Sequence, residues 1–389
     1  MEKNLDLNTT KIPNELNLIF EILKTEEHEK IPKERYVDID WELFLQQAFH
    51  HRLYPLLYSK LNKNNNSLVP ANVFQTLADS YRENTFRMLH LCGEMDRISK
   101  LFLENDIRPL FLKGPTLAAD LYEDISKRTC GDLDILVPLE SLHLAEKLLI
   151  NIGYEKDEYI KSFLNDWKWR HHHFTYYHKN GTKIEIHWRL NPAPSKEPSF
   201  KELWKRKRET EFGNTPIYTL GYEDLFYFLV SHGARHGWSR LRWLTDIHQI
   251  LMKDLKWENV LKVLRMHKAE HIAGQALILS ASLINSKIPN ETVVLTTPRQ
   301  SKKLAQDAIF YLERMINLHS DPVPKDIAKY HSKHLFTLMS KSQRFIYLLT
   351  ILHPYYTDIE TFPLPKKLHF LYFPLRPFLW AWRKTKKLA

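Results

Sequence analysis

The spacing of apolar residues changes twice along this 389-residue chain, and these changes limit its possible folds more than any other feature. Up to about residue 105, and again from Tyr222, apolar side chains recur every three or four residues, as one buried helix face requires. Between these stretches, short apolar runs separated by turn residues indicate strands. The sequence therefore predicts an α+β protein, with a mixed β-sheet core flanked by N- and C-terminal helical regions.

This pattern divides the chain into four segments. We expect an N-terminal helical region over 1–105, an α/β core over 106–220, a C-terminal helical bundle over 221–350 and a basic aromatic tail over 351–389. In the first segment, Pro55 is expected to interrupt a helix, and a polar stretch at 63–67 to be a loop. In the second, Pro115 is expected in the first turn of a helix, and Asn180-Gly181 between two strands predicts a hairpin. The contents of 43% hydrophobic and 26% charged residues are ordinary for a globular protein.

The composition of the chain indicates the cell compartment in which it works and the class of partner that it binds. Cys92 and Cys130 lack the paired spacing of a disulfide framework or a thiolate zinc site, so a reducing compartment is expected. The N-terminus has no secretory apolar region, and no run is apolar enough to span a bilayer. We therefore expect a cytoplasmic protein. The net charge of +10 favours anionic partners, without choosing among nucleotides, nucleic acid and phospholipid headgroups.

Three acidic residues in the predicted core form the candidate chemical site. Strand residues two apart face the same side, so Asp132 and Asp134 project together while Leu133 points the opposite way. Neighbouring carboxylates repel each other unless a cation lies between them, and hard oxygen ligands suit Mg²⁺ or Mn²⁺. Glu185, on a later alternating strand, would add a third carboxylate for a two-metal phosphoryl-transfer site. His187 shares its face and is either a general base or a hydrogen-bonded strand histidine.

A wider set of residues accompanies these acids. It comprises Leu112-Lys113-Gly114, Arg128, Asp132-Leu133-Asp134-Ile135-Leu136-Val137, Glu185-Ile186-His187-Trp188, His232, Trp238, Leu241, Trp243-Leu244 and Asp246. The order of strand, glycine turn, helix, Asp-x-Asp strand and third acid resembles the nucleotidyltransferase superfamily of DNA polymerase β-like fold. The whole set resembles more closely the bacterial family of uncharacterised nucleotidyltransferases, and the resemblance covers most of the chain. Its motifs are specific in combination rather than singly.

The resemblance implies a nucleotidyltransferase-type sheet and a metal site formed by Asp132, Asp134 and Glu185. The superfamily usually has Gly-Ser at the glycine turn, where backbone amides and the hydroxyl hold the nucleotide phosphates. This chain has Lys113-Gly114-Pro115 there, and a proline has no amide to donate. The ammonium of Lys113, at a helix N-terminus, is expected to replace the lost donors. Arg128 is expected either to contact a phosphate or to brace the two aspartates.

The implied activity is transfer of a nucleoside monophosphate from an NTP, with Mg²⁺ or Mn²⁺, to a hydroxyl of an unidentified small molecule or peptide. Two alternatives stay open at this point. One is modification of a macromolecule, tRNA or protein, which the basic run Trp204-Lys205-Arg206-Lys207-Arg208 would favour if it formed a stripe beside the cleft. The other is a scaffold that keeps the fold without catalysis.

Three further features carry predictions about structure. His171-His172-His173 is expected to send at most one histidine into the cleft, because consecutive strand residues face opposite sides. His232 and Asp246 are expected to hydrogen-bond each other as a structural clasp. The tail from Phe370 to Leu388 combines aromatic and basic residues, as peripheral membrane segments do, but Pro374 and Pro377 should break its helix. Docking of the tail onto the helical bundle is therefore the favoured prediction.

Overall fold

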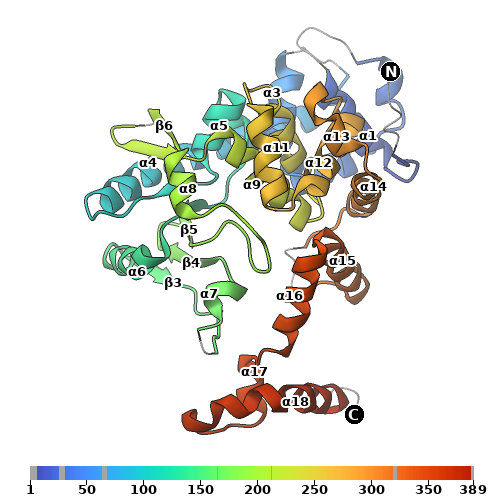
Figure 1. The fold of residues 1–389 in the computed structure, drawn as a ribbon. Helices are drawn as coiled ribbons and strands as arrows, with labels where there is room; N and C mark the ends of the chain where they lie inside the picture. Colours follow the sequence, from blue (N-terminus) through green and yellow to red (C-terminus); the bar gives the residue numbers. More distant parts are fainter. Residues whose placement is uncertain are drawn as a thin grey trace.

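The structure is a computed structural model that describes residues 7–25, 31–63, 68–163, 165–211, 213–318 and 322–386. Most of the loop predicted at 63–67 lies outside these residues. The fold class is α+β, as predicted: a mixed seven-stranded sheet has helices before and after it in the chain (Figure 1). The division of the chain into separate domains stays a prediction.

Four helices and one 3-10 turn form the N-terminal part. They are α1 (Asn14–Lys24), η1 (Lys33–Tyr36), α2 (Trp41–His50), α3 (Tyr54–Lys63) and α4 (Ala71–Leu103). The helix break expected at Pro55 occurs just before it, where Arg52 adopts a φ of 59° between α2 and α3. Pro55 itself is the second residue of α3, where its missing amide costs no intrahelical hydrogen bond.

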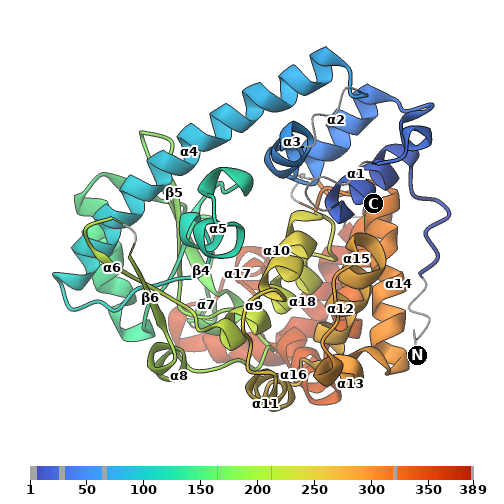
Figure 2. The same ribbon diagram turned by 90° about the horizontal axis from the view of Figure 1, so that it is seen from above.

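The long helix α4 connects these N-terminal helices to the sheet. Figure 2 shows it running along one side of the molecule, from α2 and α3 to the strands near α6. The apolar stripe predicted along this helix is largely buried, and Met88, Met95 and Ile98 lie in one core cluster with Leu133 and Ile135. One sheet face is thus covered by α4, which leaves the alternate residues of the same strands on the opposite face.

The sheet has the strand order β3-β4-β5-β2-β1-β7-β6. Its strands are β1 (Leu110–Phe111), β2 (Leu133–Leu136), β3 (Tyr154–Lys156), β4 (His173–His178), β5 (Lys183–His187), β6 (Arg208–Glu211) and β7 (Pro216–Thr219). Strands β4 and β5 form the hairpin predicted from Asn180-Gly181, and Gly181 has a positive φ of 88°. The central strands β2 and β5 run parallel, which sets the register of the candidate site.

Short helices connect the strands, and a group of packed helices follows them. The connecting elements are α5 (Pro115–Tyr122), η2 (Ile125–Lys127), η3 (Leu139–Ser141), α6 (Leu142–Asn151), α7 (Trp167–Arg170) and α8 (Phe200–Lys205). The packed group is α9 (Tyr222–Arg235), α10 (Arg242–Ile250), α11 (Trp257–Met266), α12 (Glu270–Ile284), η4 (Asn290–Thr292), α13 (Val293–Thr296), α14 (Arg299–Glu313) and α15 (Lys325–Leu338). Among the described helices, none combines the length and the apolarity needed to cross a membrane.

The end of the chain forms an arm that departs from the prediction. The arm comprises α16 (Lys341–Leu352), α17 (Tyr356–Thr361), η5 (Lys366–Leu371) and α18 (Tyr372–Lys386). Pro374 and Pro377 lie inside α18 instead of breaking it: Pro374 falls in the first turn, where amides have no intrahelical partner, and Pro377 costs one hydrogen bond.

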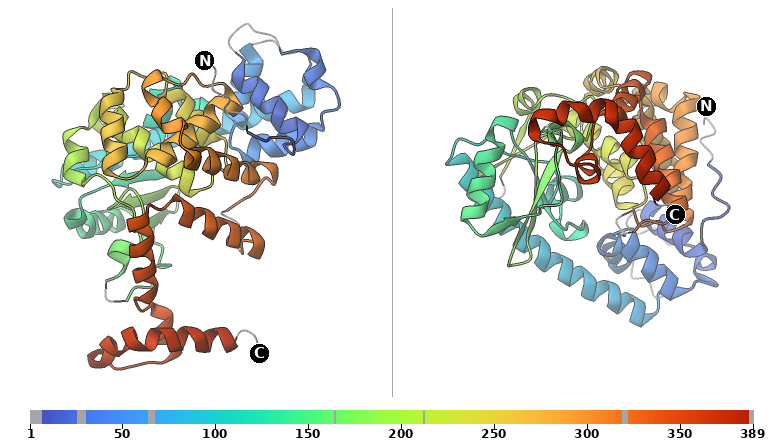
Figure 3. Two further views of the ribbon diagram at one scale, coloured as in Figure 1. Left: turned by 45° about the vertical axis from the view of Figure 1, so that its right-hand side comes forward. Right: turned by 90° about the horizontal axis from the view of Figure 1, so that it is seen from below.

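The arm also docks elsewhere than expected. In Figure 3 it extends away from the packed helices, with α18 lying across its far end. Tyr372 packs edge-on against Phe163 with ring centroids 5.6 Å apart, and Lys161 pairs with Glu360 at 2.9 Å. These contacts join α17 and α18 to the segment before α7. The prediction that the tail docks onto the helical bundle is therefore wrong.

Candidate active site

The parallel pairing of β2 and β5 brings the predicted acids together. Asp134 is the register partner of Glu185, and their side chains share the sheet face opposite the α4 core. Asp132 immediately precedes β2 and lies on the same side, because the ammonium of Lys183 reaches both Asp132 (3.2 Å) and Glu185 (2.6 Å). The three carboxylates predicted from the sequence thus converge in one place.

Lys183 is a site residue that the sequence reasoning missed. Its ammonium lies between Asp132 and Glu185 and offsets their repulsion. These two acids outweigh the effect of burial and raise the pKa of Lys183 above its usual range. The signal was present in the sequence, since Lys183 is two residues before Glu185 and must share its strand face.

Asp134 is the most enclosed of the acids. Its Oδ1 accepts a hydrogen bond from His187 Nε2 at 2.9 Å, and Lys113 Nζ lies 3.0 Å from Oδ2. That ammonium is not aligned for a hydrogen bond, so Oδ2 is buried without a hydrogen-bond donor among the described residues. A buried carboxylate oxygen without a donor is costly, and the charge of Lys113 beside it offsets part of that cost.

Charges and hydrogen bonds set the protonation of this group. Burial raises the pKa of Asp132, and the charges of Asp134 and Glu185 raise it further. Burial alone would raise the pKa of Asp134, but Lys113 and the hydrogen bond from His187 outweigh it and leave that pKa low. For His187, burial alone would lower the pKa, but the hydrogen bond to Asp134 and the Glu185 carboxylate 3.5 Å away raise it. His187 is therefore a proton donor to Asp134 in this arrangement.

The donor set is chemically suited to a divalent cation. Asp134, Glu185 and His187 each offer one ligand atom, and these atoms lie within 4.8 Å of one another. Carboxylate oxygens favour Mg²⁺ or Mn²⁺, and Oδ2 of Asp134, which is ion-paired with Lys113 but accepts no hydrogen bond from the described residues, is a candidate ligand. Asp132 stands beside this set, held through Lys183.

Two histidines of the His171-His172-His173 run reach the cavity, so the expectation of at most one is wrong. The rings of His172 and His173 lie 5.4 and 5.0 Å from His187, whereas His171 contacts Tyr159. His172 precedes β4, so the rule that consecutive strand residues face opposite sides of the sheet does not apply to it. Burial lowers the pKa of both, that of His173 to about 4 with His187 as a further cause, so both are neutral at pH 7.

Carboxylates and arginines line the same cavity, of about 470 Å³, and its arginine wall consists of Arg52, Arg235, Arg240 and Arg242. Arg52 comes from the link between α2 and α3, Arg240 from the link between α9 and α10, and Arg242 is the first residue of α10. Burial, then Arg52 and Arg242, lower the pKa of Arg240 to about 10. Like charges held together in this way favour an anion between them. The sequence reasoning missed this wall because its members come from segments far apart in the chain.

Arg128 does not line this cavity, contrary to the expectation of a phosphate contact or a brace for the aspartates. It is 2% exposed, and its Nε and Nη2 each donate to Asp246 at 2.8 Å. Tyr122 also donates to Asp246, at 2.7 Å. The predicted clasp between His232 and Asp246 is accordingly wrong: His232 instead lines the cavity and packs edge-on against Trp243.

The glycine turn holds Lys113 in place. Gly114 has φ 111° and ψ −153°, a conformation that only glycine adopts without strain. It is the N-cap of α5, and Pro115 occupies the first helical position, as predicted. The turn therefore points the preceding Lys113 toward Asp134 rather than offering a run of free amides.

A buried histidine links the two arginine-bearing segments and predicts a pH effect. His51 Nδ1 accepts a hydrogen bond from the Leu241 amide at 3.3 Å, and burial, with His50 and Arg240 nearby, lowers the pKa of His51 well below its usual value. Below about pH 6.5 the His51 side chain binds a proton in the unfolded chain but stays neutral in the folded chain. The free energy of unfolding should fall with decreasing pH, by up to about 1.4 kcal/mol per pH unit from this group.

Urea unfolding at pH 7 and pH 5 measures this effect. The variant His51→Gln should lose less stability over that interval than the unsubstituted chain, because it lacks the titrating group. An equal loss in both proteins would contradict the assignment of His51 as a neutral structural acceptor.

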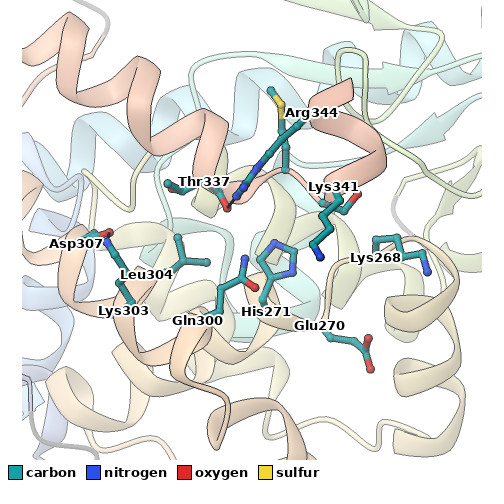
Figure 4. A pocket seen from close by; sticks show the side chains of 12 residues that line it. Lys268, Glu270, His271, Gln300, Lys303, Leu304, Asp307, Thr337, Lys341 and Arg344 are labelled. Atoms are coloured by element: carbon teal, nitrogen blue, oxygen red, sulfur yellow. Dashed lines mark hydrogen bonds and ion pairs between the residues drawn. The ribbon is translucent and has the colours of Figure 1, made fainter. Parts of the chain in front are cut away.

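A separate pocket lies between α12, α14 and the start of α16 (Figure 4). Its polar side chains largely engage each other or the backbone: Lys303 pairs with Asp307, His271 bonds the Leu338 carbonyl, and Arg344 donates to the Phe336 carbonyl. We interpret this pocket as part of the packing contact that holds the first turn of α16 against the packed helices.

Comparison with known proteins agrees with this geometry. A family model described as uncharacterised nucleotidyltransferase matches residues 37–285, which run from α2 to the end of α12 and include the whole sheet. Neither the comparison with curated proteins nor that with solved structures gives a match. The family match covers more than half of the chain and supports nucleotidyl transfer as the general class of reaction. The chain belongs to the uncharacterised nucleotidyltransferase family.

Proposed function

We propose that this protein transfers a nucleoside monophosphate from an NTP to a hydroxyl group of a small molecule or peptide, with Mg²⁺ or Mn²⁺. One observation carries the proposal: carboxylates on adjacent parallel strands line a single cavity together with a group of arginines. The acceptor oxygen would form a bond to the α-phosphorus while the bond to the β-phosphate breaks, and pyrophosphate would leave.

Asp132, Asp134 and Glu185 are the proposed cation ligands. A bound divalent cation neutralises charge on the phosphates and favours ionisation of the attacking hydroxyl. Lys183, which now lies between Asp132 and Glu185, would give up that place when a cation binds. We propose that His187 positions Asp134 rather than acting as the general base, because its raised pKa and its hydrogen bond make it a donor.

The arginine wall is the proposed triphosphate site. Arg242 donates through Nη1 to the Thr129 carbonyl at 2.7 Å, while its Nε is buried without a partner among the described residues. A guanidinium recognises phosphate oxygens through two donors at once. Lys113 would contact the phosphates from the carboxylate side, and Gly114 would hold it there.

A second cavity is the proposed acceptor site. It measures about 260 Å³ and shares Arg235 with the cavity that holds the carboxylates. Ile272, Leu335 and Phe336 contribute apolar walls, and the buried Asn191 has an Nδ2 without a partner among the described residues. Apolar walls with a few polar groups are typical of small-molecule sites. This favours an acceptor with an apolar body.

The basic run at 204–208 gives no support to a macromolecular acceptor. Arg206 pairs with Asp224, and Arg208 pairs with Asp120, each at 2.7 Å. Lys207 lies over the Trp204 ring at 4.6 Å. These residues are engaged away from the cavity, so they form no stripe beside it.

Calorimetry with ATP, CTP, GTP and UTP in the presence of Mg²⁺ tests the proposal. At least one NTP should bind, and Arg240→Gln should raise its Kd about tenfold, since one charge-assisted contact is lost. Arg265→Gln is the matched control, because Arg265 pairs with Glu270 outside the cavity. Absence of NTP binding, or binding unchanged in Asp132→Ala/Asp134→Ala, would favour the scaffold alternative.

A further inference from the structure

The C-terminal arm, residues 341–386, exposes an unusual amount of apolar surface. In Figures 1 and 3, α16 extends from the packed helices and α18 lies across its end. Every side chain of α16 is at least partly exposed, including Phe345 at 64% and Leu352 at 56%. Single exposed apolar residues are ordinary, but a helix with seven large apolar side chains all left uncovered is not.

Helix α18 also exposes large apolar side chains. One side of it packs Tyr372 and Leu379 against Phe163, and Arg376 is buried in a 3.1 Å pair with Asp358. Elsewhere around the helix, Phe373, Phe378 and Trp380 are exposed. A surface helix normally buries its apolar residues and exposes polar ones. Here large apolar residues are exposed as well, which favours contact with an apolar partner.

The charges of the arm identify the kind of partner. Residues 341–386 contain eight lysines and arginines but only two acids, Asp358 and Glu360. Asp358 is buried and paired with arginines, and Glu360 pairs with Lys161. Exposed lysines accompany the aromatic rings, and Lys384 lies 4.2 Å from the centre of the Trp380 ring. The apolar surface is thus bordered by positive charge.

An anionic lipid surface matches this combination. Tryptophan and phenylalanine insert at the boundary between headgroups and acyl chains, and lysines beside them contact anionic headgroups. A second copy of the chain is disfavoured as the partner, because symmetric pairing through this face would bring like charges together. Helices α17 and α18 also lie at one end of the molecule, where a flat surface can reach them (Figure 1).

We propose that the C-terminal arm binds the surface of an anionic membrane, with the exposed aromatic side chains of α18, and the exposed side chains of α16 nearest to them, at the lipid boundary. The binding is peripheral, since the aromatic rings enter the interface and the lysines contact headgroups. It is independent of the proposed nucleotidyl transfer. Tyr347 of α16 also lines the proposed acceptor cavity, so α16 connects that cavity to the rest of the arm.

Vesicle flotation of the full chain tests this proposal. The protein should float with vesicles of phosphatidylcholine mixed with phosphatidylglycerol, and much less with phosphatidylcholine alone. Added salt should weaken the binding, since it screens the lysines. Phe378→Ser/Trp380→Ser should reduce the bound fraction relative to the free fraction by at least about tenfold, because two inserting rings are lost.

A matched control distinguishes binding by the arm from nonspecific binding of exposed apolar side chains. Phe86 and Leu89 are exposed on α4, so Phe86→Ser/Leu89→Ser removes apolar surface elsewhere and should leave flotation unchanged. Flotation that is absent with both vesicle types, or equal for both double variants, would overturn the proposal. A dimer in solution that the Phe378→Ser/Trp380→Ser change dissociates, without any flotation, would assign the surface to a second copy instead. NTP binding should be unaffected in every case.

Discussion

Asp134→Asn is expected to lower nucleotidyl transfer at least about a thousandfold, which corresponds to roughly 4 kcal/mol of lost transition-state stabilisation. Asp134 is the buried acid that accepts a hydrogen bond from His187 and is ion-paired with Lys113, and its Oδ2 accepts no hydrogen bond from the residues that the structure describes. An amide has nearly the same shape but no charge, so it neither holds a divalent cation nor balances Lys113. The change should also abolish Mn²⁺ binding at the site.

The measurement is transfer of label from an α-phosphate-labelled NTP to the small molecules of a cell extract, with Mn²⁺ binding followed by electron paramagnetic resonance. Asp120→Asn is the matched control, because Asp120 pairs with Arg208 and Tyr222 outside the cavity. The Asp120→Asn variant should keep both nucleotidyl transfer and Mn²⁺ binding. Retention of transfer and Mn²⁺ binding by folded Asp134→Asn would remove this aspartate from the site.

Asp246→Asn is expected to lower the free energy of unfolding by about 3–5 kcal/mol, as removal of one partner of a buried ion pair does. The Asp246 carboxylate accepts hydrogen bonds from Nε and Nη2 of Arg128 and from the hydroxyl of Tyr122. Without its carboxylate, the Arg128 guanidinium stays buried and unpaired. The pair joins the segment before β2 to α10, so its loss should loosen the cavity wall.

Urea denaturation measures this loss, and a double variant isolates its cause. Arg128→Met/Asp246→Leu removes both charges and should be less destabilised than the sum of the corresponding single changes. Single variants that lose less than about 1 kcal/mol would show that the pair is well solvated, contrary to its burial.

The sequence predicted the parts of this fold that depend on local periodicity. The α4 stripe, the hairpin at Asn180-Gly181 and the proline at the start of α5 follow from spacing and from backbone preferences of single residues. The convergence of Asp134 with Glu185 was also accessible, because alternation fixes the face of each residue once both segments are strands.

The sequence did not predict pairings set by tertiary packing. Arg128 and Asp246 are 118 residues apart, and nothing local indicates that each is the partner of the other. Arg52 and Arg240 likewise meet only because His51 joins their two segments. The expected position of the arm failed for a related reason: its inward contacts with Phe163 depend on a loop whose place no periodicity reveals.

Diffraction from crystals grown with Mn²⁺ and a non-hydrolysable α,β-methylene NTP, at the manganese absorption edge, would locate the cation and the phosphates in the cavity. We expect manganese bound by Asp134 and Glu185, the Lys183 ammonium displaced, and the phosphates directed toward Arg240 and Arg242. Manganese or nucleotide bound elsewhere, with Lys183 still between Asp132 and Glu185, would contradict the proposed site.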